Sequence, residues 1–339
     1  MFKKALIYLL LLSTTLSFSQ IGGKYTYQFL NLVTSPRQAA LGGKIVTLYD
    51  SDVNQAIYNP ATINNEMDNH LSVNYGNYYG EVTYGTAAYA YTWDRHVQTF
   101  HMGVNYVDYG TFEGRDEMGL MTGDFTGSEI AVSFGYAYNI PWTDIYLGAN
   151  GKLISSTLES YNSFGAALDV GAIYIDEDND INIGLSLRNM GMQITTYAGT
   201  QEKLPFEIIA GISQEMENVP LRWHVTLENL QQWNIAFSNP NRAEESIDGE
   251  VTEEKVSFFN NALRHLIVGA ELFPGKSFNL RLGYNFRRGE ELRIEDKRSF
   301  SGISAGVSIR FNKLRFDYSY SRYTLAANTS LFGLTINLQ

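Results

Sequence analysis

The residues best suited to catalysis form the run Gly302-Ile303-Ser304-Ala305-Gly306, which matches the nucleophile-elbow pattern of hydrolases. That chemistry requires a serine on a strained strand-to-helix turn, with an acid and a histidine later in the chain. Here the run lies within a segment of period-two alternation that is followed by another, and no histidine follows His265. We therefore interpret Ser304 as part of a small-residue strand face, and we predict that the protein is not an enzyme.

Candidate metal ligands are scattered along the chain. Five histidines show no paired ligand spacing; they are His70, His96, His101, His224 and His265. Zinc would require residues from separate strands to meet inside a barrel. The acidic residues 176–180 supply hard oxygen ligands but lack the glycine and distal glutamate of a calcium loop, so a solvated turn is the main interpretation and calcium the alternative. We predict no metal and no cofactor.

Composition excludes several classes of protein. The chain of 339 residues has no cysteine, which excludes disulfides and thiol catalysis. A net charge of −11 argues against nucleic-acid binding and against a basic membrane-surface anchor. Aromatic residues make up 14% of the chain, with 23 tyrosines. Soluble sandwiches can also be rich in tyrosine, but aromatic girdles at two membrane interfaces explain the excess better.

The first nineteen residues have the pattern of a secretory signal peptide. Lys3 and Lys4 precede an apolar stretch over residues 5–12, and small polar residues lead to Ser19, after which we predict cleavage. The apolar stretch is too short to span a bilayer as a helix, and no later stretch approaches that length. Because only helices and closed barrels satisfy every backbone group in lipid, a membrane-spanning form of this chain must be a barrel.

Alternating hydrophobicity repeats along the chain. At the C-terminal end, Phe332, Leu334 and Ile336 fall on one face of a ten-residue segment, and smaller or polar residues fall mainly on the other. From residue 70 onward we count fourteen such segments: 70–77, 84–93, 97–107, 128–139, 143–158, 161–175, 180–189, 205–216, 221–233, 263–273, 277–287, 302–311, 313–323 and 329–338. The sequence predicts an all-β, fourteen-stranded antiparallel transmembrane barrel over residues 70–339.

Charged residues fall on the face opposite the apolar one. A charge that faces lipid at mid-membrane costs about 2–4 kcal/mol, so the charged face must line the interior. The residues expected to point inward are Lys152, Asp169, Arg188, Glu228, Glu271, Arg281, Arg310, Arg315 and Asp317. This set favours a plugged polar interior over an apolar channel.

The connections alternate between short turns and long loops. The long set includes residues 108–127, 191–204, 234–262 and 288–301. This asymmetry predicts long loops outside the cell and both termini in the periplasm. The loop 234–262 is acidic, with Glu244, Glu245, Asp248, Glu250, Glu253 and Glu254. It is either a flexible solubilising loop or a docking site for a partner, because long loops concentrate partner contacts.

Residues 20–69 break the strand pattern. Ser51 or Asp52 could cap a short helix, and Pro60 could open another helical turn. The segment is too polar and irregular to face lipid, so it must lie inside the barrel or in the periplasm. We predict a hatch or plug, whose marker residues are Pro36, Arg37, Gly42, Gly43, Asp52, Asn59, Pro60 and Ala61. The predicted division is therefore signal peptide 1–19, plug 20–69 and barrel 70–339.

The run 36–43, then Asp52 and the Asn59-Pro60-Ala61 turn, ahead of fourteen strands, resembles the fatty-acid-transporter-type barrel family. Members of that family place an N-terminal hatch with an Asn-Pro-Ala turn in the barrel lumen. Within the family, residues 23–32 resemble the outer-membrane barrels of the type IX secretion system. The resemblance covers nearly the whole mature chain, and the N-terminal sixty residues are its most specific part.

The resemblance implies a non-enzymatic anchor in the outer membrane. Its extracellular loops would hold a PorZ-like surface protein, beside a PorU-like sortase and a PorV-like barrel, in a complex that processes cargo and links it to lipopolysaccharide. The alternative is a channel for hydrophobic compounds, as in fatty-acid-transporter relatives, because fold alone does not separate the two functions. Both interpretations surround the barrel with outer-membrane lipid and assign it no nucleic-acid partner.

Overall fold

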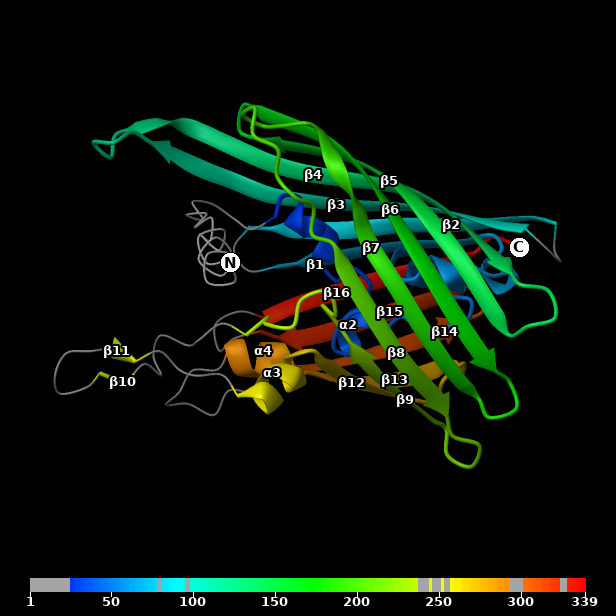
Figure 1. Cartoon of the computed structure of the whole chain (residues 1–339). Helices are drawn as coiled ribbons and strands as arrows, with labels where there is room; N and C mark the ends of the chain where they lie inside the picture. Colours follow the sequence, from blue (N-terminus) through cyan, green and yellow to red (C-terminus); the bar gives the residue numbers. More distant parts are fainter. Residues whose placement is uncertain are drawn as a thin grey trace, which may run out of the picture.

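The computed structural model describes residues 25–78, 81–94, 98–236, 244–245, 251–252, 257–292, 301–323 and 328–339. Fourteen antiparallel strands close into a barrel, and the first strand, β1, pairs with the last, β16 (Figure 1). The predicted fold class and strand number are confirmed. No helix within the described ranges is long and apolar enough to cross a membrane.

The strands of the barrel are β1 His70–Asn77, β2 Thr83–Asp94, β3 Gln98–Arg115, β4 Met121–Asn139, β5 Ile145–Leu158, β6 Tyr161–Asp176, β7 Ile181–Thr195, β8 Glu207–Glu215, β9 Leu221–Leu227, β12 Leu266–Leu272, β13 Phe278–Asn285, β14 Ile303–Phe311, β15 Leu314–Arg322 and β16 Asn328–Asn337. A separate two-stranded sheet is formed by β10 Glu244–Glu245 and β11 Val251–Thr252. The helices are η1 Gln28–Asn31, α2 Pro36–Ala40, η2 Val53–Ile57, η3 Pro60–Thr62, η4 Asn65–Met67, α3 Phe258–Arg264 and α4 Phe286–Glu291.

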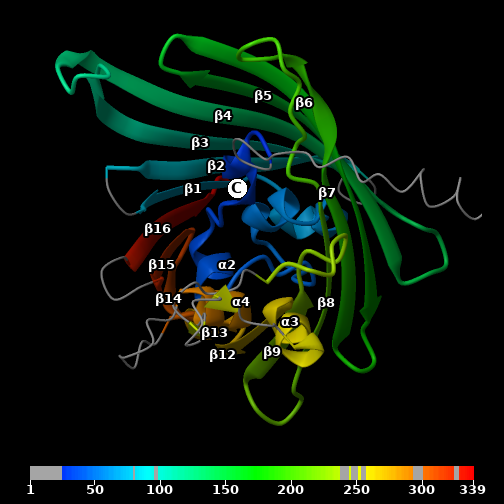
Figure 2. The same cartoon turned by 60° about the vertical axis from the view of Figure 1, so that its left-hand side comes forward.

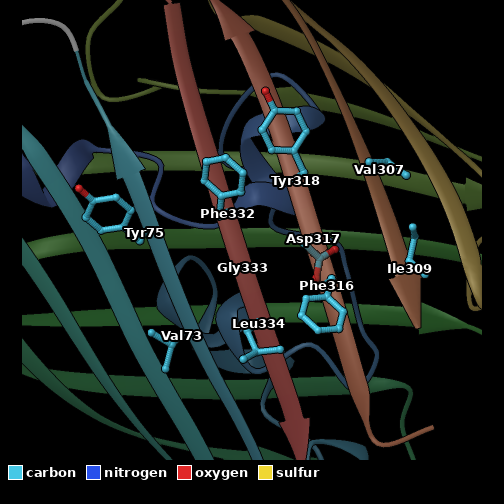
Figure 3. Close-up of a pocket in the computed structure, with 10 residues that line it drawn as sticks. All are labelled: Val73, Tyr75, Val307, Ile309, Phe316, Asp317, Tyr318, Phe332, Gly333 and Leu334. Carbon is cyan, nitrogen blue, oxygen red and sulfur yellow. The ribbon is translucent and has the colours of Figure 1, made fainter. Parts of the chain in front are cut away.

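The barrel wall separates apolar from polar side chains. On β16, Phe332 is 57% exposed on the outer wall, whereas its neighbour Leu331 is buried inside. Outward side chains of β1 and β14–β16 line a shallow apolar cavity of about 380 Å³ on this wall (Figure 3); they include Val73, Tyr75, Val307, Ile309, Phe316, Tyr318, Phe332 and Leu334. An outward apolar wall and an inward polar wall are what a barrel in lipid requires.

The segment 108–127, which we predicted as a loop, is instead a β-hairpin. β3 and β4 continue to Arg115 and Met121, past their last pairs with the neighbouring strands at Asp108 and Gly127. Figure 1 shows this hairpin projecting beyond the other strands. The prediction was wrong because the glycines in the segment are turn signals in a sequence pattern, whereas here Gly114 and Gly123 pair across the two strands.

The two ends of the described chain lie at opposite ends of the barrel. Beside the short turns, the Leu338 N–H donates to the Asn69 carbonyl, just before β1. Beside the long connections, the Thr26 N–H donates to the carbonyl of Lys203 in the β7–β8 connection. The prediction that both termini lie at the short-turn end therefore holds only for the C-terminal end of the described chain. The predicted signal peptide, with its cleavage after Ser19, lies outside the described residues.

We expect Phe134→Arg to impair barrel assembly, because Phe134 is 56% exposed on the outer wall of β4. An arginine facing lipid there costs about 2–4 kcal/mol. The measurement is the fraction of heat-modifiable, folded protein in outer-membrane preparations. The matched control is Trp142→Arg, at a fully exposed tryptophan in a short turn. Equal folded fractions for the two variants would contradict the assignment of the lipid-facing wall.

Candidate functional site: the barrel lumen

The lumen is filled by residues 25–69, which we call the plug (Figure 2, where they are blue). Its helix α2 contacts β13–β16, η2 contacts β1–β3, and η3 contacts β4–β6. Nearly every residue between Thr34 and Leu48 is buried, and so are Asp52–Asn64. The described plug therefore touches most of the circumference of the wall, and its polar backbone is sheltered from lipid.

Inward-facing glycines of the wall make room for the plug backbone. A Cβ atom at Gly148 would lie 2.3 Å from the carbonyl carbon of Pro60, and one at Gly283 would lie 2.1 Å from that of Leu41. These separations are far below a van der Waals contact, so no other residue type fits without displacing the plug. The wall is thus shaped for close approach of another backbone at these positions.

The Asn-Pro-Ala turn joins the plug to the wall. The Asn59 side chain caps η3 by accepting from the Ala61 N–H at 3.0 Å, and Pro60 occupies the first helical position. The Asn59 amide also donates to the carbonyls of Val46 in the plug and Ala172 in β6, at 2.7 and 3.3 Å. The Asn59 side chain therefore caps its own helix and also links the plug to the barrel wall through hydrogen bonds.

A closed circuit of buried ion pairs, which we call the ion-pair ring, fixes the plug near the short-turn end. Plug and wall residues alternate in charge around it, in the order Arg37, Glu271, Arg281, Asp317, Arg315 and Asp52. The distances between successive charged atoms are 2.8, 3.0, 2.7, 3.0 and 3.0 Å, and the circuit closes at 3.6 Å between Arg37 and Asp52. No side chain in the ring is more than 10% exposed.

Arg37 joins the plug to the wall and contacts three carboxylates. Its Nε and Nη2 donate to the two carboxylate oxygens of Glu271 at 2.8 and 2.9 Å, a bidentate geometry. Its Nη1 lies 2.8 Å from Asp50. Arg222 of β9 approaches both acids, at 3.6 Å from Asp50 and 3.6 Å from Glu271. The buried positive charge of Arg37 is therefore matched by several carboxylates.

Ion pairing keeps the side chains of Arg37 and Asp50 charged although both are in the lumen. Burial alone would lower the pKa of Arg37, but the carboxylates of Asp50 and Glu271 raise it well above its usual range. Burial alone would likewise raise the pKa of Asp50, but Arg37 and Arg222 lower it to about 2. Opposite charges at short distance outweigh desolvation in both cases.

A second group of ion pairs lies nearer the long-connection end. Lys44 of the plug is 2.5 Å from Glu207 of β8, which is also 3.2 Å from Arg188 of β7. The Arg188 guanidinium donates to the Leu30 carbonyl at 3.3 Å and lies 5.5 Å from the centre of the Tyr58 ring. These contacts hold the plug at two heights in the lumen.

Most residues predicted to point inward do so. Lys152, Asp169 and Arg188 are buried, and so are the ring residues of the wall, whereas Arg310 is exposed at the short-turn mouth. All eight marker residues of the plug lie in the lumen and are buried. The sequence analysis did not single out Lys44, Asp50 and Glu207. The available signal was that charged residues of a polar segment inside a barrel need partners of opposite charge on the inward face of the wall.

The other candidate sites have simple structural roles. Ser304 is buried within β14, which leads to strand β15 and not to a helix, and its hydroxyl accepts from Arg288 at 3.3 Å. The Asp176 carboxylate accepts the Asp178 and Asn179 N–H groups, which makes residues 176–180 a hydrogen-bonded turn. Among the described residues, no group of three histidine or acidic side chains is placed to hold a metal ion.

The acidic loop is only partly described. Glu244 and Glu245 form β10, while Asp248, Glu250, Glu253 and Glu254 lie outside the described residues. The docking role predicted for this loop therefore stays a prediction.

A cavity of about 360 Å³ lies between the plug and the wall at the long-connection end. Apolar, aromatic and charged side chains all line it, and they include Val33, Lys44, Tyr78, Glu207, Glu228, Arg287, Arg288, Leu292 and Tyr323. By contrast, cavities of about 170 and 250 Å³ at the short-turn end have mainly polar linings.

Solved structures of other barrels resemble this one. A mutant of TodX, a monoaromatic hydrocarbon channel, matches it with a TM-score of 0.54 at 14% sequence identity, over 90% of this chain and 97% of TodX. A FadL homologue from Pseudomonas aeruginosa matches with a TM-score of 0.50 at 11% identity, over 90% of this chain and 98% of the homologue. This chain shares their fold. No protein-family model and no curated protein sequence matches it.

The shared fold agrees with the resemblance seen in the sequence. At such low identity the likeness concerns the fold alone, so the residues of the lumen and the loops must carry the functional argument.

We expect Glu271→Gln to destabilise the barrel and its plug. The substitution leaves the buried cations Arg37 and Arg281 without their shared carboxylate, and breaking a buried pair costs about 3–5 kcal/mol. The measurement is the melting temperature of the purified protein in detergent. The control is Glu113→Gln, which removes an exposed pair with Arg115 and should cost less than about 1 kcal/mol. Equal shifts would show that the ring contributes little.

The lowered pKa of Asp50 predicts a loss of stability in acid. Because its folded pKa of about 2 lies below the unfolded value of about 3.9, its contribution is complete above about pH 5 and is lost as pH falls toward 2. Melting temperatures measured from pH 6 to pH 2 should fall less steeply in Asp50→Asn than in the parent chain. Parallel profiles would refute this role for Asp50.

Proposed function

We propose that this chain is a non-enzymatic outer-membrane barrel that anchors a soluble partner protein at the cell surface. The observation that carries the proposal is the attachment of the plug to the wall by buried ion pairs at two heights. A channel must move such a segment, or lead around it, each time a substrate passes. Breaking several buried pairs at once is costly, so the plug is better suited to stiffening the barrel than to opening it.

The long connections support the same function. β3 and β4 project past their neighbours, and helices α3 and α4 contact each other at the same end of the barrel (Figure 1). Connections of this size exceed what closing a turn requires. A rigid barrel would hold them at a fixed place above the membrane.

The sequence resemblance supplies candidate partners for the anchor. Residues 23–32 most resemble PorQ, the outer-membrane barrel of the type IX secretion system. On that basis the partner is a PorZ-like surface protein, and the wider attachment complex contains a PorU-like sortase and a PorV-like barrel. This complex would process cargo and link it to lipopolysaccharide.

Passage of hydrophobic compounds is the second candidate function, and the comparisons favour it over the anchor at the level of fold. The TodX structure is named as a monoaromatic hydrocarbon channel. The cavity of about 360 Å³ at the long-connection end, with Val33, Tyr78 and Tyr323 in its lining, could receive a small amphiphile. A channel would still need a route past the plug.

An engineered disulfide between plug and wall, which we call the lock, can distinguish the two candidate functions by experiment. Thr47 of the plug and Gly211 of β8 are suited to it, because the Thr47 Cγ2 atom lies 3.3 Å from the position of a Cβ at residue 211. The chain has no cysteine of its own, so Thr47→Cys with Gly211→Cys would form a single defined cross-link.

We expect the oxidised lock to leave the anchor intact. Cells that carry it should retain the PorZ-like protein at their surface as well as cells with the parent chain do, while cells without the barrel release that protein into the medium in folded form. Uptake of labelled toluene or oleate should be the same with the lock oxidised or reduced. Uptake that stops on oxidation and returns on reduction would instead favour the channel. Retention of the partner in cells without the barrel would refute the anchor.

A further inference from the structure

Among the described strands, the hairpin formed by the ends of β3 and β4 pairs with no other part of the barrel wall. We call residues 111–126 the arm. Its last contact with a neighbouring strand pair is at the base, where the Thr126 carbonyl accepts from the Glu159 N–H. Above this point residues 112–115 pair only with residues 121–125 among the described strands. At about 3.3 Å per residue the paired part extends about 15 Å past the base.

The arm has one apolar face and an apolar tip. Phe112 and Phe125 pair directly across the two strands, with ring centroids 5.3 Å apart and nearly parallel planes. At the tip, Met118, Leu120 and Met121 are 87%, 63% and 66% exposed. An isolated hairpin is only marginally stable in water, and large exposed apolar patches mark interaction sites.

The opposite face and the tip are acidic. Glu113 and Asp124 pair across the strands on the face that alternates with the phenylalanines. Asp116 and Glu117 add two more negative charges near the tip, and the single arginine of the arm, Arg115, pairs with Glu113 at 2.9 Å. The four acidic side chains outnumber this one cation, so the face and the tip carry a net negative charge that suits a partner with cations.

The tip is shaped before any partner binds. The Asp116 carboxylate accepts the N–H groups of Met118 and Leu120 at 2.9 and 2.8 Å. The Gly119 N–H donates to the Asp116 carbonyl at 2.9 Å. A turn held by several internal hydrogen bonds presents its methionines in one arrangement, which lowers the entropy lost on binding.

We propose that the arm is the docking element for the anchored protein, and that this partner lays an extended segment with basic neighbours along one free edge of the hairpin. This proposal rests on the anchor function. Both edges of the arm offer unpaired backbone N–H and C=O groups, which an added strand can satisfy. Apolar side chains of the partner would cover Phe112 and Phe125, and its cations would face Glu113 and Asp124.

The acidic charge of the arm argues against two other occupants, a second copy of the chain and lipopolysaccharide. A second copy of the chain would bring an equally acidic arm against the first, which is unfavourable. Lipopolysaccharide carries anionic phosphates and would likewise be repelled by Asp116, Glu117 and Asp124. A soluble protein with a basic rim around an apolar strip is the occupant that fits both the charge and the free edges.

Site-specific cross-linking identifies the occupant. Met118→Cys places a single thiol at the tip of an otherwise cysteine-free chain. Thr200→Cys, in the exposed β7–β8 connection at the same end, is the control. Intact cells are treated with a thiol-to-amine cross-linker, and the product is identified by mass spectrometry. We expect the Met118→Cys barrel to capture one soluble surface protein at least five times more efficiently than the control, with capture falling as salt is raised.

A shortened arm tests whether this contact holds the partner. Residues 112–125 are replaced by Asn-Gly, which suits a tight turn between the paired Thr111 and Thr126. The barrel should assemble as before, judged by heat-modifiable migration, while the cross-linked protein moves into the medium and its retained fraction falls at least fivefold. Glu113→Lys with Asp124→Lys should weaken retention without shortening the arm.

The outcomes distinguish the arm from the anchor. If the parent barrel retains the partner and the shortened arm retains it equally well, the docking role of the arm is wrong and the anchor stands. If cells without the barrel also retain it, both proposals fail. Cross-links only to a second copy of the chain, or only to lipopolysaccharide, would overturn the proposed occupant.

Discussion

Buried charge is the constraint on which this structure depends. The wall supplies a chain of alternating charges with two open ends, a negative one at Glu271 and a positive one at Arg315. The plug supplies Arg37 and Asp52 in the order that closes the circuit. A plug placed the other way round would set like charges against each other in a site with little water. Electrostatics therefore selects one position of the plug, beyond any contribution to stability.

Shape reinforces this selection. The plug backbone approaches the wall most closely where the wall has inward-facing glycines, at Gly148 beside Pro60 and at Gly283 beside Leu41. These glycines lie at different heights and on different strands, so the plug cannot slide or turn without meeting side chains. The ion pairs and the glycine contacts therefore favour the same position of the plug in the lumen. Such agreement between electrostatics and packing is typical of a sequence that specifies one structure.

The sequence predicted local patterns well and long-range pairings poorly. The alternation that marks Phe332 and Leu334 as outward residues has a period of two, so it can be read from a few neighbours. The predicted helix cap is equally local, and Asp52 provides it by accepting from the Asn54 N–H at the start of η2. The pair between Arg37 and Glu271 joins residues 234 positions apart, and it depends on strand register and on the path of the plug. The arm was missed for a different reason, since its glycines resemble turn residues until their partners are known.

The strands of the barrel differ greatly in length, and the longest ones, which form the arm, depend on the plug for support. β4 has 19 residues, whereas β9 and β12 have seven each, and about ten residues suffice to cross a membrane. The extra length of β3 and β4 therefore serves something outside the bilayer. A projecting hairpin can transmit force or hold a partner only if its base is stiff. Just below the arm, Val107 of β3 and Ala131 of β4 belong to one buried apolar cluster with Tyr27, Phe29 and Leu30 of the plug. The segment that fills the lumen therefore also supports the strands that extend beyond it.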